Sequence, residues 1–176
     1  MLLNLWGGNL SLRRSDCLDV GFADSAFRGG YHADRDFGLR CLKAGLSGVF
    51  DRSLRAKHLY RRGLNGFVTD ARSSGATLLL VHERHSDVVG ALDLESRFRR
   101  GLPRPAAWLV AACRQQVTRR LVVASLLGAI RCRWALRVTA LSLPAARLLR
   151  RIEQQHGALA ALRETGHSRR LKLPVR

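Results

Sequence analysis

The chain has 176 residues, of which 47% are apolar and 6% are aromatic. A chain of this size can bury one sizeable core, or one small domain with an appendage, which excludes two complete catalytic domains. Its formal net charge of +18 lies mostly in the second half: residues 1–90 have 13 Lys or Arg against 9 Asp or Glu, and residues 91–176 have 18 against 4.

The four cysteines lie far apart in the sequence and form no Cys-x-x-Cys pair, so neither a zinc site nor a disulfide framework is predicted. They are Cys17, Cys41, Cys113 and Cys132. We therefore expect reduced thiols and a cytoplasmic protein. The amino terminus does not resemble a secretory signal, because Arg13 and Arg14 follow its short apolar start. The longest charge-free segment of the second half, 121–130, is shorter than the roughly 20 residues that a membrane span needs.

The first elements in chain order are a strand over residues 2–6, ended by two glycines, and a short helix over residues 16–20. A helix of about three turns is predicted to begin at Asp34 and to end at Lys43, because acidic residues come first, a basic residue comes last and Gly45 follows. Residues 46–50 then have the pattern of a short buried strand. With two strands and a helix, the expected fold class is α/β.

Apolar residues recur at helical spacing over residues 66–84, although residues 78–81 would also suit a strand. We expect residues 1–90 to form the first domain and residues 91–105, rich in Gly and Pro near their end, to form a linker. Residues 106–165 predict a basic helical tail that is interrupted near Pro144. Residues 166–176 are expected to be disordered.

Two carboxylates stand two residues apart at the start of the helix predicted over 34–43. Asp36 and Arg40 are four residues apart, so they lie on one helix face and can form a structural ion pair. Asp34, at the helix boundary, can project into a cleft and take a proton from an attacking hydroxyl group. The alternative is that Asp34 only caps the helix, which is a frequent role of Asp.

Five short segments follow one another within residues 2–85: Gly7 to Arg14, Val20 to Phe22, Asp34 to Arg40, Lys43 to Gly45, and Lys57 with His58. The resemblance of these segments, in this order, is to the second half of family 2 glycosyltransferases and equally to the carboxyl-terminal domain of galactosyltransferases. It implies the acceptor-side part of a GT-A domain, the fold of enzymes that use nucleotide-diphospho-sugars. The implied activity is transfer of a hexosyl group from a nucleotide sugar to a hydroxyl acceptor.

The resemblance also assigns roles to individual residues. Asp34 corresponds to the catalytic base of inverting members, and Asp36 and Arg40 correspond to its supporting residues. Gly8 and Asn9 correspond to a turn beside the sugar-binding cleft. The remaining expected site residues are Trp6, which would stack on a sugar ring, Tyr31, which would line the substrate site, and His58, which falls where some members place a metal ligand.

Two departures from the family pattern affect the expected activity. Ala33 stands where the family usually has Glu, a residue that commonly helps to hold the acceptor. The nucleotide-binding strands and the metal-binding Asp-x-Asp of the family have no counterpart in the sequence. The family implies a divalent metal, Mn or Mg, but a lone His58 binds a metal weakly. Residues outside this sequence would therefore provide most of the metal ligands. The sequence thus predicts a truncated or split-gene transferase fragment.

The basic second half supports a different expectation, a non-catalytic module at an anionic membrane surface. Its Ala/Leu/Arg segments resemble amphipathic helices that lie in a membrane interface, which would suit peripheral association at the inner face of the membrane and a lipid-linked acceptor. The alternative is that these helices pack on the core and solvate their Arg side chains. Nucleic-acid binding ranks below both, because no known nucleic-acid module is present. For His82 and His85, we expect a solvated or core-edge role.

Overall fold

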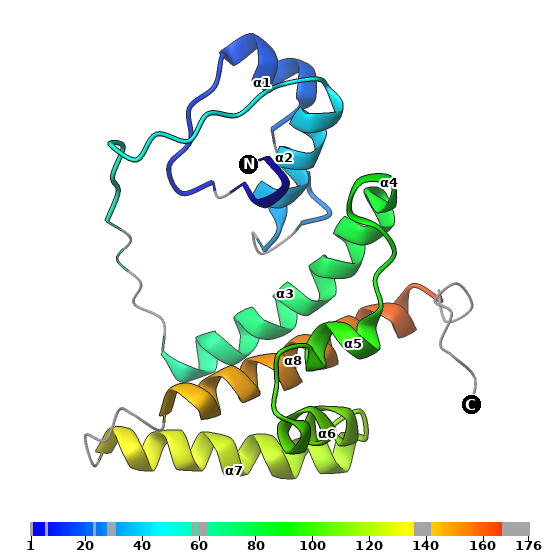
Figure 1. Cartoon of the computed structure of the whole chain (residues 1–176). Coiled ribbons are helices and arrows are strands. Elements are labelled where there is room, and N and C mark those ends of the chain that lie inside the picture. The colour runs from blue at the N-terminus through cyan, green and yellow to red at the C-terminus, as the bar shows by residue number, and fades with distance from the viewer. Residues whose placement is uncertain are drawn as a thin grey trace. The chain divides into compact units, whose positions relative to one another are not determined.

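Helices make up the regular structure of the residues that the structure describes (Figure 1). The computed structural model describes residues 2–5, 7–22, 24–27, 31–57, 59, 63–135 and 142–166. The elements in chain order are η1 (Leu2–Asn4), α1 (Arg14–Val20), α2 (Ala33–Lys43), α3 (Leu64–Arg84), α4 (Ser86–Val89), α5 (Leu94–Arg99), α6 (Arg104–Ala112), α7 (Gln116–Ala135) and α8 (Ser142–Glu164).

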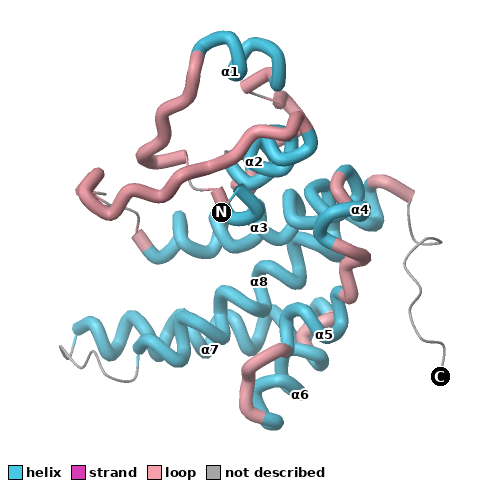
Figure 2. The backbone as a smooth tube through the Cα atoms, turned by 45° about the horizontal axis from the view of Figure 1, so that its top comes forward, coloured by secondary structure: helices cyan, strands magenta, loops and turns pink. Residues whose placement is uncertain are grey.

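The predicted α/β fold class, and with it the GT-A fold, is wrong for the part of the chain that is described. Figure 2 shows helix and loop there and no strand. Residues 2–4, predicted as part of a strand, form the 3-10 turn η1, in which the Leu5 amide donates to the Leu2 carbonyl at 3.3 Å. Residues 46–50 have no regular structure, and the side chains of Val49 and Phe50 are 87% and 72% exposed. A short apolar segment becomes a strand only where a neighbouring strand accepts its backbone hydrogen bonds.

The chain divides into two compact units. Unit 1 consists of residues 1–61 and 80–90, and unit 2 consists of residues 62–79 and 91–176. Helix α3 contributes to both, since its last five residues, 80–84, belong to unit 1. The predicted first domain, 1–90, therefore differs from unit 1 by residues 62–79, which belong to unit 2. Residues 91–105, predicted as a linker, include α5 and the start of α6.

Unit 1 is organised around α2. The apolar side of this helix contributes Leu39, which is fully buried with Phe27 and Val81. Gly38 allows η1 to lie directly on the helix, because a Cβ atom at this position would stand 2.3 Å from the Leu2 carbonyl oxygen. A glycine inside a helix costs about 1 kcal/mol relative to alanine. Close packing of η1 explains its presence here.

The predicted carboxyl end of α2 is confirmed. The helix ends at Lys43, and Gly45 has the left-handed φ of 78° that the sequence pattern requires. The Leu46 amide donates to the Cys41 carbonyl and the Gly45 amide to the Leu42 carbonyl, each at 3.0 Å. This is the Schellman arrangement, which satisfies two of the carbonyl groups that a helix end leaves free.

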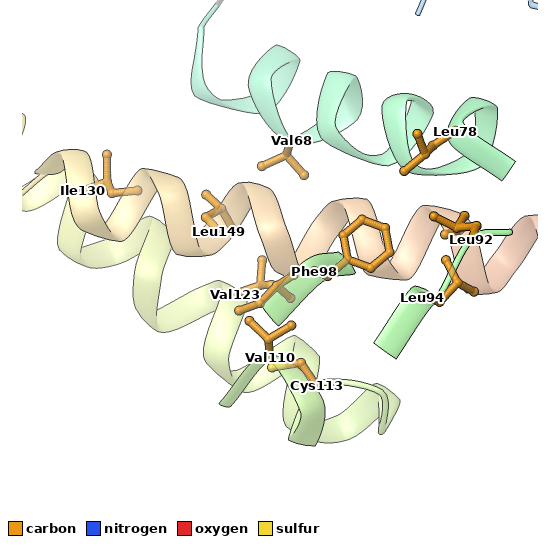
Figure 3. Close-up of a cluster of buried hydrophobic side chains, with 12 residues drawn as sticks. Val68, Leu78, Leu92, Leu94, Phe98, Val110, Cys113, Val123, Ile130 and Leu149 are labelled. Carbon is orange, nitrogen blue, oxygen red and sulfur yellow. The ribbon is translucent and has the colours of Figure 1, made fainter. Parts of the chain in front are cut away.

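Unit 2 has the larger apolar core, drawn in Figure 3. Phe98 of α5, Val110 of α6, Ile130 of α7 and Leu149 of α8 are each at most 2% exposed. The apolar residues on α7 and α8 recur at three- and four-residue intervals, so each helix turns one continuous stripe toward this core. Pro144 lies in the first turn of α8, where a missing backbone N–H costs no intrahelical bond. Residues 136–141 and 167–176 lie outside the described residues.

Two glycines allow α3 and α8 to approach closely within unit 2. A Cβ at Gly75 would stand 1.9 Å from the Gln154 carbonyl oxygen, and a Cβ at Gly157 would stand 2.0 Å from the Arg72 carbonyl oxygen. Beside this crossing, the fully buried Glu153 accepts hydrogen bonds from Arg72 and, at 3.0 Å, from Arg119. A buried carboxylate needs such partners, because burial of an unpaired charge costs several kcal/mol.

None of the helices in the described part of the chain combines the length and the apolar composition needed to cross a membrane.

Candidate functional site

The candidate site of unit 1 begins at the first turn of α2. The helix starts at Ala33, and His32 occupies the cap position with a left-handed φ of 60° and no side-chain capping bond. Asp34, which the sequence placed at the cap, thus lies inside the first turn. One of its carboxylate oxygens, Oδ1, accepts a hydrogen bond from the Arg35 amide at 2.8 Å, so it satisfies one of the free N–H groups of the helix start.

The second oxygen of the Asp34 carboxylate contacts the glycine turn near the amino terminus. The Gly7 amide donates to Asp34 Oδ2 at 3.2 Å, across 27 positions of sequence. A Cβ at Gly7 would stand 3.4 Å from the Asp34 Cβ, so the backbone of the turn lies against this side chain. Gly8 and Asn9 are exposed on the same turn, and the Asn9 side-chain amide donates to the Leu54 carbonyl at 3.4 Å.

Asp36 is a buried carboxylate of unit 1, with 1% of its surface exposed. Its Oδ2 accepts from Arg40 Nε at 2.9 Å, which confirms the predicted ion pair between positions four apart. Its Oδ1 lies 2.9 Å from His85 Nε2 and 3.9 Å from Arg84 Nη1. Three basic side chains therefore surround a carboxylate that is withdrawn from water.

Arg40 connects Asp36 to the end of α1. Its Nη1 donates to the Val20 carbonyl at 2.6 Å and also to the Gly21 carbonyl, and its Nη2 donates to the Phe22 carbonyl at 3.4 Å. These carbonyls lie at the carboxyl end of a helix, where the dipole and the free acceptors favour a cation. The guanidinium group also lies over the Phe37 ring, 5.4 Å from its centroid.

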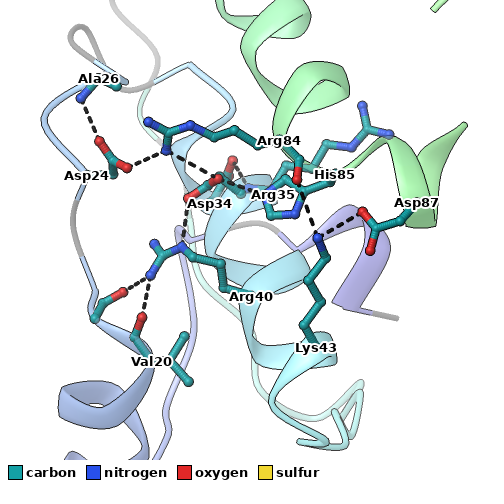
Figure 4. Close-up of polar contacts among 12 residues, drawn as sticks. Val20, Asp24, Ala26, Asp34, Arg35, Arg40, Lys43, Arg84, His85 and Asp87 are labelled. Carbon is teal, nitrogen blue, oxygen red and sulfur yellow. Dashed lines mark hydrogen bonds and ion pairs between the residues drawn. The ribbon is translucent and has the colours of Figure 1, made fainter. Parts of the chain in front are cut away.

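A second set of ion pairs links the end of α3 and α4 to the rest of unit 1 (Figure 4). Arg84 pairs with Asp24, and Lys43 pairs with Asp87 at 2.9 Å. Hydrogen bonding to Arg84, with a smaller contribution from the Ala26 amide, lowers the pKa of Asp24 below its usual value. Hydrogen bonding to Lys43 likewise lowers the pKa of Asp87.

The described residues do not fit the divalent metal that the family resemblance implies. No group of three or more His, Cys, Asp or Glu side chains gathers at one place in the part of the chain that is described. Asp36 cannot serve as a ligand, because both of its oxygens face basic groups. His58, the predicted metal ligand, and Trp6, the predicted stacking residue, lie outside the described residues.

The sequence predicted some of these contacts and missed others. Asp34, Gly8 and Asn9 do lie in one region, and Tyr31 stands half-buried just before α2. The role of His85 was missed: it is 3% exposed and pairs with Asp36, which is 49 positions away. The one sequence feature that pointed to His85 was its position directly after the helix predicted over 66–84. No local feature of the sequence indicated Asp36 as its partner.

Comparisons with known proteins add no family name. No protein-family model matches the chain, and neither a curated protein nor a solved structure matches it.

The arrangement leaves the Asp34 carboxylate able to accept a further hydrogen bond. Asp34 is a half-buried carboxylate, and each of its oxygens accepts one described backbone hydrogen bond. A carboxylate oxygen has two lone-pair directions, so each keeps a direction for a further donor such as a hydroxyl group. Asp36 has a different role, since it holds the segments around Asp34 in place.

Proposed function

We propose that unit 1 forms the acceptor side of a sugar-transfer site, in which Asp34 acts as the general base for a hydroxyl acceptor. The reaction would be transfer of a hexosyl group from a nucleotide sugar. The contact between Asp34 and the glycine turn, 3.2 Å from Gly7 N to Oδ2, is the main support. It joins two segments that each resemble family 2 glycosyltransferases and that are distant in the sequence.

A second contact supports the same proposal. Arg40 joins the segment 34–40 to the segment 20–22 through hydrogen bonds to the Val20, Gly21 and Phe22 carbonyls. Three of the segments on which the resemblance rests therefore meet at α2. Helices and loops make these contacts, so the arrangement does not require the α/β fold that the described residues lack.

The choice of Asp34 over Asp36 as the base follows from burial and charge. A general base must lie within hydrogen-bond reach of the proton that it removes. Asp36 is 1% exposed and both of its oxygens are occupied by Arg40 and His85, so no acceptor hydroxyl can reach it. Asp34 is only half-buried and retains acceptor capacity.

Gly8 and Asn9 would contact the acceptor sugar, because they are exposed on the turn that adjoins Asp34. Exposed backbone amides and a side-chain amide provide donors and acceptors suited to sugar hydroxyl groups. Tyr31, half-buried before α2, is the remaining candidate for the acceptor site. No step of the proposal uses a metal, and donor binding is not assigned to any described residue.

The test compares three forms of the full chain: wild type, Asp34→Asn, and Asp19→Asn as a matched control on the exposed side of α1. Transfer is assayed with a panel of nucleotide hexoses and simple hydroxyl acceptors. General base catalysis contributes about 10²–10⁴-fold, so Asp34→Asn is expected to lose at least about 100-fold in rate while the control keeps it. Equal rates in all three forms would exclude Asp34 as the base.

A binding experiment covers the case in which the chain transfers no sugar alone. Methyl glycosides are titrated into ¹⁵N-labelled protein, and the amide signals of Gly7, Gly8, Asn9 and Arg35 are followed. We expect these signals to shift in wild type and to shift less in Asp34→Ala. A chain that neither transfers sugar nor shows shifts at these amides would overturn the proposal.

A further inference from the structure

A long acid-free segment accounts for most of the positive charge of unit 2. Between Glu95 and Glu153, residues 96–152 contain 13 Arg and no Asp or Glu in 57 residues. Helices α6 and α7 lie entirely within this segment, as does the first part of α8. A surface built from these helices has almost no acidic side chains to balance its arginines, so it attracts anions.

Helix α7 is apolar on two opposite sides. Its inner side contributes Val123 and Ile130 to the core of unit 2, together with the buried Arg119. Its exposed side has Val117 and Leu121, which are 70% and 66% exposed. A surface helix normally has polar residues opposite its buried stripe, so this pattern needs an explanation.

Exposed residues form one continuous strip along α7. At 100° per residue, positions 117, 121, 124, 128 and 132 fall within about 80° of one another, opposite the buried positions 119, 123 and 130. Two arginines follow one edge of the strip. We call this strip the outer face of α7, and its members are Val117, Arg120, Leu121, Ala124, Ser125, Gly128, Arg131 and Cys132.

The arginines of the outer face indicate which kind of partner surface would cover it. A second copy of the chain would bring Arg120 and Arg131 against the same two arginines with no acid to pair them. A nucleic acid would match the arginines, but it would leave Val117 and Leu121 uncovered, and the outer face contains no aromatic side chain for stacking on a base. An anionic lipid surface provides phosphates for the arginines and acyl chains for the apolar residues.

We propose that the outer face of α7 docks in the interface of an anionic membrane, with the helix lying in the membrane plane. Val117 and Leu121 enter the acyl boundary. Arg120 and Arg131 contact lipid phosphates. Arg131 also lies 3.5 Å from the Asn65 side-chain oxygen, a contact long enough to be exchanged for a phosphate at little cost.

Co-sedimentation of the full chain with vesicles tests the charge requirement. The vesicles contain phosphatidylcholine alone or mixed with phosphatidylglycerol, at physiological and high salt. We expect binding only to the anionic vesicles. The double variant Arg120→Gln/Arg131→Gln is expected to bind about 30-fold more weakly, since each arginine near such a surface contributes about fivefold. The charge-matched control Arg52→Gln/Arg55→Gln, at exposed positions of unit 1, should stay within about twofold of wild type.

A second pair of variants tests the apolar requirement. Val117→Gln/Leu121→Gln keeps every charge, and it is expected to weaken binding roughly thirtyfold because two partly inserted aliphatic side chains are lost. The matched control is Val49→Gln/Leu54→Gln, which changes two side chains that are 87% and 64% exposed in unit 1. Equal binding by Val117→Gln/Leu121→Gln and wild type would overturn the proposal, because binding would then be electrostatic adsorption without insertion.

Cys132 provides a direct measure of insertion. It is exposed on the outer face, whereas Cys41 and Cys113 are buried, so an environment-sensitive fluorophore can be attached there once Cys17 is replaced by Ser. We expect a blue shift of its emission on anionic vesicles. The same fluorophore placed at position 52 by Arg52→Cys, with Cys132→Ser, should not shift. An unshifted Cys132 label, or binding to a DNA duplex without binding to vesicles, would overturn the proposal.

Discussion

Replacement of Gly75 by Ala tests the close crossing of α3 and α8 in unit 2. The added Cβ would stand 1.9 Å from the Gln154 carbonyl oxygen, whereas an ordinary contact is at least 3.4 Å. The two backbones must therefore separate locally by about 1.5 Å, the difference between these distances. Backbone atoms have no alternative rotamer, so the helices have to shift.

The expected loss of stability follows from the contacts that the separation of α3 and α8 disturbs. Overpacking of a tight interior contact costs about 1–3 kcal/mol. The shift also loosens the ion pair between Arg72 and the fully buried Glu153, and the hydrogen bond from the Gln154 side chain to Ser74 Oγ at 3.2 Å. The higher helix propensity of Ala returns about 1 kcal/mol. Overpacking and helix propensity together leave a loss of about 0–2 kcal/mol. The loosened ion pair and hydrogen bond add about 2 kcal/mol, so we expect a net loss of about 2–4 kcal/mol in the free energy of unfolding.

Urea and thermal unfolding, followed by circular dichroism, measure this loss. Gly128→Ala is the matched control: it also lies inside a helix, α7, but no atom stands within 4 Å of its added Cβ. The control should gain about 0.5–1 kcal/mol. Gly75→Ala should lower the unfolding midpoint by roughly 5–10 °C.

Gly157 gives the same test from the opposite helix, since its Cβ would stand 2.0 Å from the Arg72 carbonyl oxygen. One separation of the helices accommodates both methyl groups. The double variant Gly75→Ala/Gly157→Ala should therefore lose less stability than the sum of the two single losses. If Gly75→Ala is as stable as Gly128→Ala, the backbones do not approach as closely as described, and the reasoning fails.

Two further predictions concern η1 and the pH dependence of stability. Gly38→Ala, whose Cβ would stand 2.3 Å from the Leu2 carbonyl oxygen, should displace η1 and move the Gly7 amide signal in an NMR spectrum; an unchanged signal would contradict the packing of η1 on α2. Burial lowers the pKa of His156 below the usual 6.5, so the unfolded chain binds the proton more readily and stability is lost as the pH falls below about 6.5. His156→Gln should show a smaller loss of urea resistance between pH 7.5 and 5.5 than wild type, and an equal loss would contradict this reasoning.

Helix α2 could be predicted from the sequence because its determinants are local. Asp36 and Arg40 face each other one turn apart, and the left-handed Gly45 ends the helix, so neither feature depends on the rest of the fold. Helix α3 was predicted for the same reason. Its observed bounds, Leu64–Arg84, include residues 78–81, whose apolar run also suited a strand. Continuous helical spacing over more than five turns outweighed the local preference of four residues.

The predicted strands failed because a strand is not a local structure. Residues 2–6 and 46–50 have apolar runs bounded by glycines and polar residues, which is the pattern of a short buried strand. This pattern indicates only that a segment can pair with another strand. It does not indicate that such a strand is present. In the described part of the chain, residues 2–4 form a 3-10 turn that packs against Gly38, and the side chains of Val49 and Phe50 are exposed.

The buried pair of His85 with Asp36 shows a second limit. A carboxylate at 1% exposure needs partners for both oxygens, and Arg40 satisfies only Oδ2. From the sequence, the second partner could be any basic residue within reach. Only the fold of unit 1 places His85 there, 49 positions away. Burial of an acid predicts that a partner exists, but the identity of the partner is set by tertiary structure.

The proposed site is held by contacts around α2 and needs none of the strands of the expected GT-A fold. Asp36 cannot be buried without Arg40 and His85, and Arg40 in turn draws the end of α1 to α2 through the Val20 and Gly21 carbonyls. Asp34 lies two residues before Asp36 in the same helix start. The fold that buries the Asp36 carboxylate therefore keeps the Asp34 carboxylate half-buried beside Gly7. The position of the proposed base is therefore set by contacts within unit 1, and it does not depend on a sheet.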